Sequence, residues 1–131
     1  MTGSAAGAPV QVWHNTDVPM YMSSPVVSGD HVYGFSNKRK GQLFCLDAKS
    51  GKVRWTTEGR SGANAALQIA GPNLVVLTTE GDLIVANKNP EKYEEVRRYK
   101  LADSQTWAQP VLLGGDILIR DAAAVSLWSL R

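Results

Sequence analysis

The sequence repeats itself about every 42 residues between Val12 and Leu130. Residues 24–33, Ser-Pro-Val-Val-Ser-Gly-Asp-His-Val-Tyr, return at residues 109–118 as Gln-Pro-Val-Leu-Leu-Gly-Gly-Asp-Ile-Leu. A fainter copy lies between them, at residues 67–75. Each copy is a run of short apolar segments separated by turn residues, and a period of this length is typical of one blade of a β-propeller. The repeat therefore predicts a chain made of propeller blades.

The strand and turn signals divide the chain into three blades. Short apolar runs bounded by Gly, Asp and Pro predict four strands in each of residues 22–55 and 65–99, and three strands in residues 107–130. A separate strand is predicted at residues 9–13, after a flexible leader at residues 1–8. If strands are lettered a to d from the axis outward, the chain reads d, abcd, abcd, abc, which is twelve strands. The expected fold is all-β, with four-stranded antiparallel sheets as blades.

An arc of three blades is too short to close on itself. Repeat proteins leave the outer faces of their first and last repeats bare unless something covers them. We expect strand 9–13 of one copy to complete the blade at 107–130 of another copy, which gives a head-to-tail ring such as a six-bladed dimer. The alternative is that the remainder of a longer propeller chain completes the ring.

Composition argues against two classes of protein. A net charge of +2 over 131 residues is too small for a typical nucleic-acid-binding domain, which concentrates basic residues on one face. No apolar window reaches the roughly 18 residues that a membrane-spanning helix needs. The basic run Lys38, Arg39 and Lys40 lies between two apolar strands and just before a glycine, so we interpret it as a solvated hairpin loop rather than a phosphate contact.

The sequence contains no recognisable catalytic, cofactor or metal-binding motif. Its single cysteine, Cys45, lies in an apolar strand and is expected to be a small buried side chain. His14 and His31 have no metal-ligand spacing to each other or to Cys45. The loop that joins the first two blades carries Arg60 and Asn64, which could hold an anion or simply keep a polar loop in water.

The strongest turn signal is the segment Asp47-Ala48-Lys49-Ser50-Gly51, which leads to Trp55. An aspartate here can accept hydrogen bonds from backbone amides two residues on, and Gly51 can take a left-handed conformation. With Cys45 in the place of a usual alanine, the segment resembles the tryptophan-docking repeat Ala-x-Asp-x-x-x-Gly-x-x-x-Trp of the PQQ-like, quinoprotein-type propellers. The resemblance covers about residues 12–130, and the full motif occurs once. A weaker similarity of residues 124–130 to the WD40 repeat has Ser129 where that family places aspartate.

The PQQ-like resemblance implies that Trp55 packs against the neighbouring blade, and that Trp13, without the Asp and Gly, does the same. The family contains quinone-dependent dehydrogenases, which use calcium and paired cysteines, and non-enzymatic bacterial propellers. Since the ligand set of the dehydrogenases is missing, we expect no cofactor and a non-catalytic scaffold for a protein or glycan partner. The alternative is a fragment of a quinone-dependent dehydrogenase. The resemblance also suggests a periplasmic or secreted protein.

Overall fold

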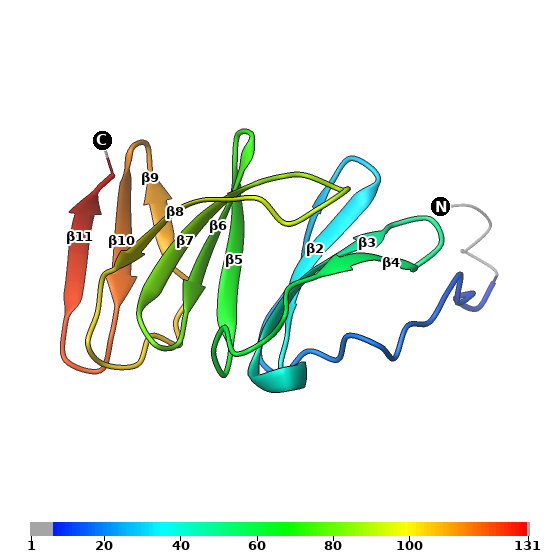
Figure 1. Ribbon diagram of the computed structural model, residues 1–131, viewed down its shortest axis with the longest axis horizontal. Coiled ribbons are helices and arrows are strands. Elements are labelled where there is room, and N and C mark those ends of the chain that lie inside the picture. The colour runs from blue at the N-terminus through cyan, green and yellow to red at the C-terminus, as the bar shows by residue number, and fades with distance from the viewer. Residues whose placement is uncertain (1–6, 131) are drawn as a thin grey trace.

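The computed structural model describes residues 7–130 as three antiparallel sheets that stand side by side in a row (Figure 1). Blade 1 contains β1 (Val26–Ser28), β2 (His31–Ser36), β3 (Gln42–Asp47) and β4 (Val53–Thr56). Blade 2 contains β5 (Ala65–Ala70), β6 (Asn73–Thr78), β7 (Asp82–Asn87) and β8 (Glu95–Lys100). Blade 3 contains β9 (Val111–Leu113), β10 (Asp116–Arg120) and β11 (Val125–Ser129). A 3₁₀ turn, η1 (Lys38–Lys40), joins β2 to β3. The predicted all-β fold is confirmed, as an open, incomplete propeller.

Strand order and register repeat from blade to blade. Each sheet is a meander in which strands consecutive in the chain are neighbours. The second strand pairs with the third in the same way each time, with the partners Tyr33 and Cys45, Val75 and Val85, and Leu118 and Leu127. Blades 1 and 2 also share a register irregularity between their third and fourth strands, at Cys45/Leu46 and at Val85/Ala86. These shared positions allow residues of different blades to be compared directly.

The innermost strands are shorter than the sequence predicted in blades 1 and 3. Strands expected at residues 22–28 and 107–113 begin only at Val26 and Val111. Each follows a proline, Pro25 or Pro110, which has no N–H to donate to a sheet ladder. Side chains just before these prolines bond to the neighbouring blade instead: Ser23 Oγ donates to the Ala65 carbonyl of blade 2 at 2.5 Å, and Gln109 Nε2 donates to the Leu67 carbonyl of blade 2 at 3.1 Å.

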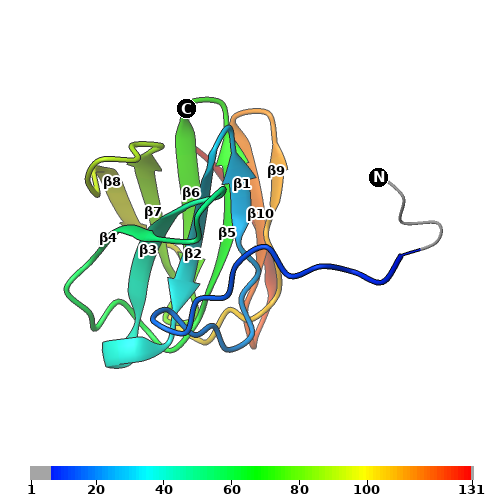
Figure 2. The same ribbon diagram turned by 90° about the vertical axis from the view of Figure 1, so that its right-hand side faces the viewer.

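The N-terminal part of the chain forms no strand among the residues described. Residues 9–13 pair with no strand of this chain, so the structure has eleven strands over residues 7–130 instead of twelve. The first described residues extend away from the sheets (Figure 2). A strand at 9–13 requires the edge of another sheet and stays a prediction. Most of the predicted leader, residues 1–6, lies outside the described residues.

Glycine occupies the same position in the first hairpin of every blade. Gly29, Gly71 and Gly114 have φ values of 59°, 58° and 62°. A positive φ at this position lets a two-residue turn follow the twist of the two strands, and glycine adopts it without steric cost. The repeated glycines in the sequence therefore mark the same tight turn three times.

The hydrophobic core lies between the blades. Blades 1 and 2 bury a cluster that consists of Tyr33, Phe35, Leu43, Cys45, Ala65, Leu67, Leu74, Val76, Ile84 and Ala86. Blades 2 and 3 bury a second cluster, formed by Val75, Leu77, Leu83, Ala102, Ile117 and Ile119. Each blade thus presents one face to the blade before it, here called its leading face, and one to the blade after it, its trailing face.

Candidate functional site

Trp55 of blade 1 makes a specific contact with blade 2. Its indole N–H donates a 2.7 Å hydrogen bond to the carbonyl of Asn89, in the connection between β7 and β8. The ring is partly buried and lies 6.3 Å from the ring of Tyr33 and 5.6 Å from the ring of Tyr93. An indole has one polar hydrogen, so a single acceptor satisfies it while its apolar surface packs between two sheets.

Trp13 makes the corresponding contact with blade 1. Its indole N–H donates a 2.8 Å hydrogen bond to the carbonyl of Ala48, in the turn between β3 and β4. Asn15 supports it, because its side-chain amide donates to the Gly51 carbonyl at 2.6 Å. Trp13 also packs with Val18 against the leading face of blade 1. The segment around Trp13 therefore contacts blade 1 as the segment around Trp55 contacts blade 2.

The Asp47 turn has the geometry that its sequence predicts. Asp47 Oδ1 accepts hydrogen bonds from the amides of Lys49 and Ser50 at 2.8 and 3.0 Å. These bonds to the ionised carboxylate lower the pKa of Asp47, that of Ser50 having the largest effect. Gly51 has a φ of 74°. The turn exposes the Ala48 carbonyl to the indole of Trp13.

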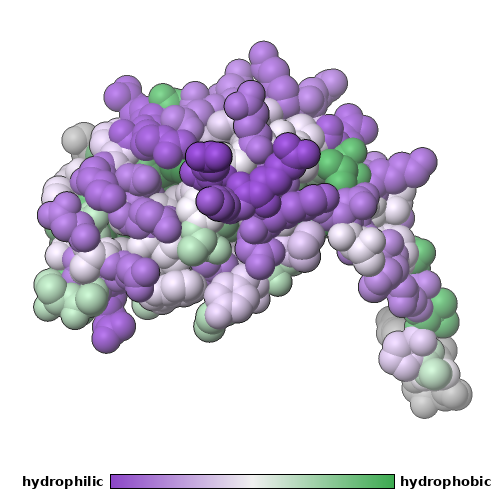
Figure 3. All heavy atoms as spheres, turned by 60° about the horizontal axis from the view of Figure 1, so that its bottom comes forward, coloured by the Kyte–Doolittle hydropathy of each residue, from purple (hydrophilic) through white to green (hydrophobic). Residues whose placement is uncertain are grey.

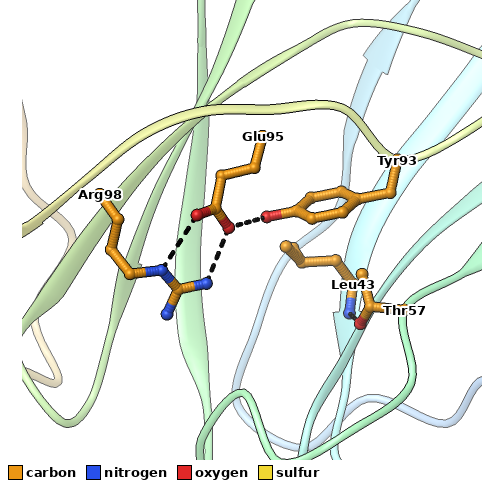
Figure 4. Close-up of polar contacts among 5 residues, drawn as sticks. All are labelled: Leu43, Thr57, Tyr93, Glu95 and Arg98. Atoms are coloured by element: carbon orange, nitrogen blue, oxygen red, sulfur yellow. Dashed lines mark hydrogen bonds and ion pairs between the residues drawn. The ribbon is translucent and has the colours of Figure 1, made fainter.

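A polar cluster that the sequence did not indicate, formed by Tyr93, Glu95 and Arg98, lies on the outer side of blade 2 (Figure 4). The ring of Tyr93 packs against Trp55. The hydroxyl of Tyr93 donates to Glu95 Oε1 at 2.6 Å, and Arg98 donates to both oxygens of Glu95 at 2.8 and 3.2 Å. The bonds from Arg98 lower the pKa of Glu95, and burial raises the pKa of Tyr93. A glutamate three residues before an arginine gives no signal of this contact in a regular strand, because such side chains lie on opposite faces; in β8 the register irregularity between Glu95 and Arg97 interrupts the alternation.

The basic run Lys38, Arg39 and Lys40 is exposed, as expected, but it is not a simple hairpin loop. Its backbone is joined to the loop after β4 by three hydrogen bonds, from the amides of residues 60, 61 and 62 to the carbonyls of residues 39, 41 and 40. Arg39, Lys40 and Arg60 have φ values of 52°, 62° and 61°. We call residues 38–41 and 58–62 the basic loop pair, and Figure 3 shows the strongly hydrophilic surface on this side of the molecule.

Arg60 and Asn64, singled out together in the sequence, have different surroundings. Arg60 lines a depression of about 410 Å³ together with Arg39, Lys40, Glu58 and Gly59. Asn64 is buried, and its Oδ1 accepts a 3.3 Å hydrogen bond from the amide of Met22. The sequence reasoning did not foresee that Arg60 lies beside the run at 38–40, because the two are joined only through the tertiary contact between loops.

The trailing face of blade 3 is open and apolar. Leu118 pairs with Val111 on one side and with Leu127 on the other, which forms an apolar row across all three strands. Val111, Leu113, Val125 and Leu127 are 47%, 51%, 64% and 59% exposed. Strand β11 pairs only with β10 among the strands described. The face and its edge are therefore available for contact.

The described residues do not fit the quinone and calcium site of the dehydrogenases. No group of three or more His, Cys, Asp or Glu side chains within residues 7–130 could hold a metal ion. Cys45, the single cysteine of the sequence, is fully buried in β3, and burial raises its pKa to about 11. A paired-cysteine ring cannot form from one cysteine. Over the same residues, no helix has the length and hydrophobicity needed to span a membrane.

Comparison with known proteins identifies the repeat. The sequence model of one family, described as "Outer membrane protein assembly factor BamB", matches residues 4–124. No curated protein sequence matches the chain significantly.

Three solved structures share the fold. BamB from Moraxella catarrhalis matches with a TM-score of 0.64 and 21% identity, over 91% of this chain and 36% of that protein. The quinohemoprotein alcohol dehydrogenase ADHIIG from Pseudomonas putida HK5 matches with a TM-score of 0.67 and 14% identity, over 88% of this chain and 20% of that protein. The computationally designed protein Ika8 matches with a TM-score of 0.65 and 15% identity, over 83% of this chain and 33% of that protein. The chain covers well under half of each of these proteins.

Proposed function

Because the chain belongs to the PQQ-like repeat family whose model is described as "Outer membrane protein assembly factor BamB", we propose that it is a non-catalytic interaction scaffold that a second copy extends head to tail. The observation that carries this proposal is the open trailing face of blade 3. The tryptophan contacts support it, because they hold successive blades in one fixed relation. A rigid arc of this kind presents its loops to a partner without any special catalytic residue.

The equivalent faces of blades 1 and 2 are buried. Leu118 and Leu127 stand at the register positions of Tyr33 and Cys45, which are 2% and 0% exposed. Val125 stands at the position of Leu43, which is 2% exposed. Apolar area that is removed from water contributes about 25 cal/mol per Å². The trailing face is therefore buried and stabilising in blades 1 and 2, whereas in blade 3 its apolar side chains stay exposed to solvent.

The leading face of a second copy is the proposed occupant. Within this chain, every trailing face that is covered is covered by the leading face of the next repeat. The leading face of blade 1 still exposes Val27, which is 63% exposed, beside the segment of Trp13 and Val18. Val10 and Val12, two residues apart, are 84% and 82% exposed and would lie on one face of a strand added to β11. Such a head-to-tail contact is heterologous and closes into a ring if its rotation allows.

The test is the mass of the particle in solution, measured by light scattering over a range of concentrations. We expect a dimer for the wild-type chain and a monomer for Leu127→Lys, because a buried lysine in the interface would lose its hydration. Val96→Lys is the matched control, since Val96 is 48% exposed on β8, away from the terminal face. A wild-type monomer at all concentrations would overturn the second-copy proposal and favour completion by further chain. A dimer that survives Leu127→Lys would show that another surface is used.

The alternative function is a fragment of a quinone-dependent dehydrogenase. The scaffold is favoured because the described residues lack the donor set that such a site needs. The two are separated by reconstitution with pyrroloquinoline quinone and calcium, followed by a dye-linked assay. Tight binding of the quinone together with reduction of the dye would overturn the proposal of a non-catalytic scaffold.

A further inference from the structure

The basic loop pair has features of a built binding site rather than of two independent surface loops. Three backbone hydrogen bonds of 2.9 to 3.1 Å join residues 38–41 to residues 58–62. The loops approach so closely that a Cβ atom at Gly41 would come within 2.2 Å of the Gly62 carbonyl oxygen. The backbones of Arg39, Lys40 and Arg60 are therefore held against one another.

The backbone of these basic residues is unusual. In the described part of the chain, the non-glycine residues with positive φ are Arg39, Lys40 and Arg60, and all three line the same depression of about 410 Å³. Left-handed conformations are unfavourable for side chains with a Cβ, and such strain gathers at functional sites. Glycine or asparagine would relieve it at these positions. The sequence has long cationic side chains there instead.

Within the described part of the chain, these three cations form no ion pair. The ion pairs of residues 7–130 involve other basic residues, namely Lys49, Arg98 and Lys100. No hydrogen bond of the Arg39, Lys40 or Arg60 side chains occurs within the described chain. The depression has a single acidic lining residue, Glu58, so its formal charge is +2, from three cations and one carboxylate.

We propose that the basic loop pair binds a phosphate group. Two guanidinium groups offer paired N–H donors that match the oxygens of a phosphate, and the Lys40 ammonium adds a third charge. The depression has room for such a group, and Arg39, Lys40 and Arg60 converge on it from the two joined loops. The phosphate belongs either to a small soluble molecule or to a lipid headgroup, since both offer the same oxygens. The site lies on blade 1 and does not involve the trailing face of blade 3.

The test is a two-dimensional amide NMR titration of the whole chain with sodium phosphate, against sodium chloride at equal ionic strength. We expect saturable shifts at residues 38–41 and 58–62 that chloride does not reproduce. Arg60→Gln keeps the strained backbone and removes a charged donor, so affinity should fall about tenfold. Arg97→Gln, which removes the same charge from an exposed position on β8, should leave it unchanged. Glu58→Gln should tighten binding.

Two further measurements separate binding from folding and identify the source of the phosphate. Arg60→Gly relieves the backbone strain, so it should melt at the same temperature as the wild type or higher while it loses affinity for phosphate. Sedimentation with phosphatidic acid vesicles, compared with phosphatidylcholine vesicles, tests a lipid headgroup. Saturable binding in either arm that Arg60→Gln weakens supports the proposal. Shifts equal in chloride, or an affinity that Arg60→Gln leaves intact, would overturn it.

Discussion

The indole ring of Trp13 lies so close to Gly51 that a Cβ atom at position 51 would come within 2.4 Å of Trp13 Cδ2. The two residues are far apart in the sequence and meet because Trp13 donates to the carbonyl of Ala48 in the same turn. Gly51 thus has two requirements, a positive φ of 74° and an empty space where a side chain would be. Gly29 has only the first, since a Cβ there would meet nothing within 4 Å.

Gly51→Ala should therefore destabilise the protein more than Gly29→Ala. Both changes place an alanine in the left-handed region, at a cost of about 1–2 kcal/mol. Gly51→Ala also displaces the Trp13 ring, so its urea midpoint should fall further. Equal midpoints for the two variants would show that the Trp13 contact contributes nothing to folding.

Trp55→Ala should lower the free energy of unfolding by about 3 kcal/mol, a cost typical of losing a large aromatic side chain from a packed site. It removes the contacts with Tyr33 and Tyr93 together with the hydrogen bond to Asn89. Trp55→Phe keeps a ring and should cost less. The control is Trp107→Ala, because Trp107 is 44% exposed, donates to the nearby Gln105 side chain, and has one ring contact among the described residues, with Tyr21 at 6.4 Å. Chemical denaturation followed by circular dichroism measures all three.

Alkaline pH should weaken the fold through the buried pair Tyr33 and Cys45, which face each other across β2 and β3. Burial raises the pKa of Cys45 from 9.0 to about 11, and burial raises the pKa of Tyr33 from 10.0 to about 12. Both groups ionise more easily in the unfolded chain, so their contribution is complete below pH 9 and is lost as pH rises toward 12. Cys45→Ala should reduce the drop in urea midpoint between pH 8 and pH 10.5. An unchanged drop would exclude Cys45 as its source.

Acid should weaken the contact between Glu95 and Arg98. The hydrogen bonds from Arg98 lower the pKa of Glu95, so the stabilisation is present above the ordinary value of 4.5 and is lost as pH falls through the native value. Since the pair is partly exposed, the effect should be below about 1 kcal/mol. Glu95→Gln should show a smaller loss of melting temperature between pH 6 and pH 3 than the wild type. A larger loss would contradict the assignment.

Local chemistry explains why much of the fold was predictable. The hairpin glycines, the alternating strands and the Asp47 turn act over a few residues, so the order abcd, abcd, abc follows from the sequence and agrees with β1 to β11. Strand limits near Pro25 and Pro110 were less accurate, because side-chain bonds to the neighbouring blade replace ladder bonds there. The separation of Arg60 from Asn64 could not be predicted, since nothing in a loop of that length indicates which residue turns inward.

The sequence by itself determined that this protein is a series of antiparallel sheets with turns at set positions, because backbone conformation and alternating hydrophobicity are properties of neighbouring residues. Only the tertiary structure decided which carbonyl each indole would meet, which loops would be joined around Arg39 and Arg60, and which apolar face would be left without a neighbour. These features depend on how one sheet is placed against the next. That placement results from the packing of side chains many tens of residues apart, which no local pattern encodes.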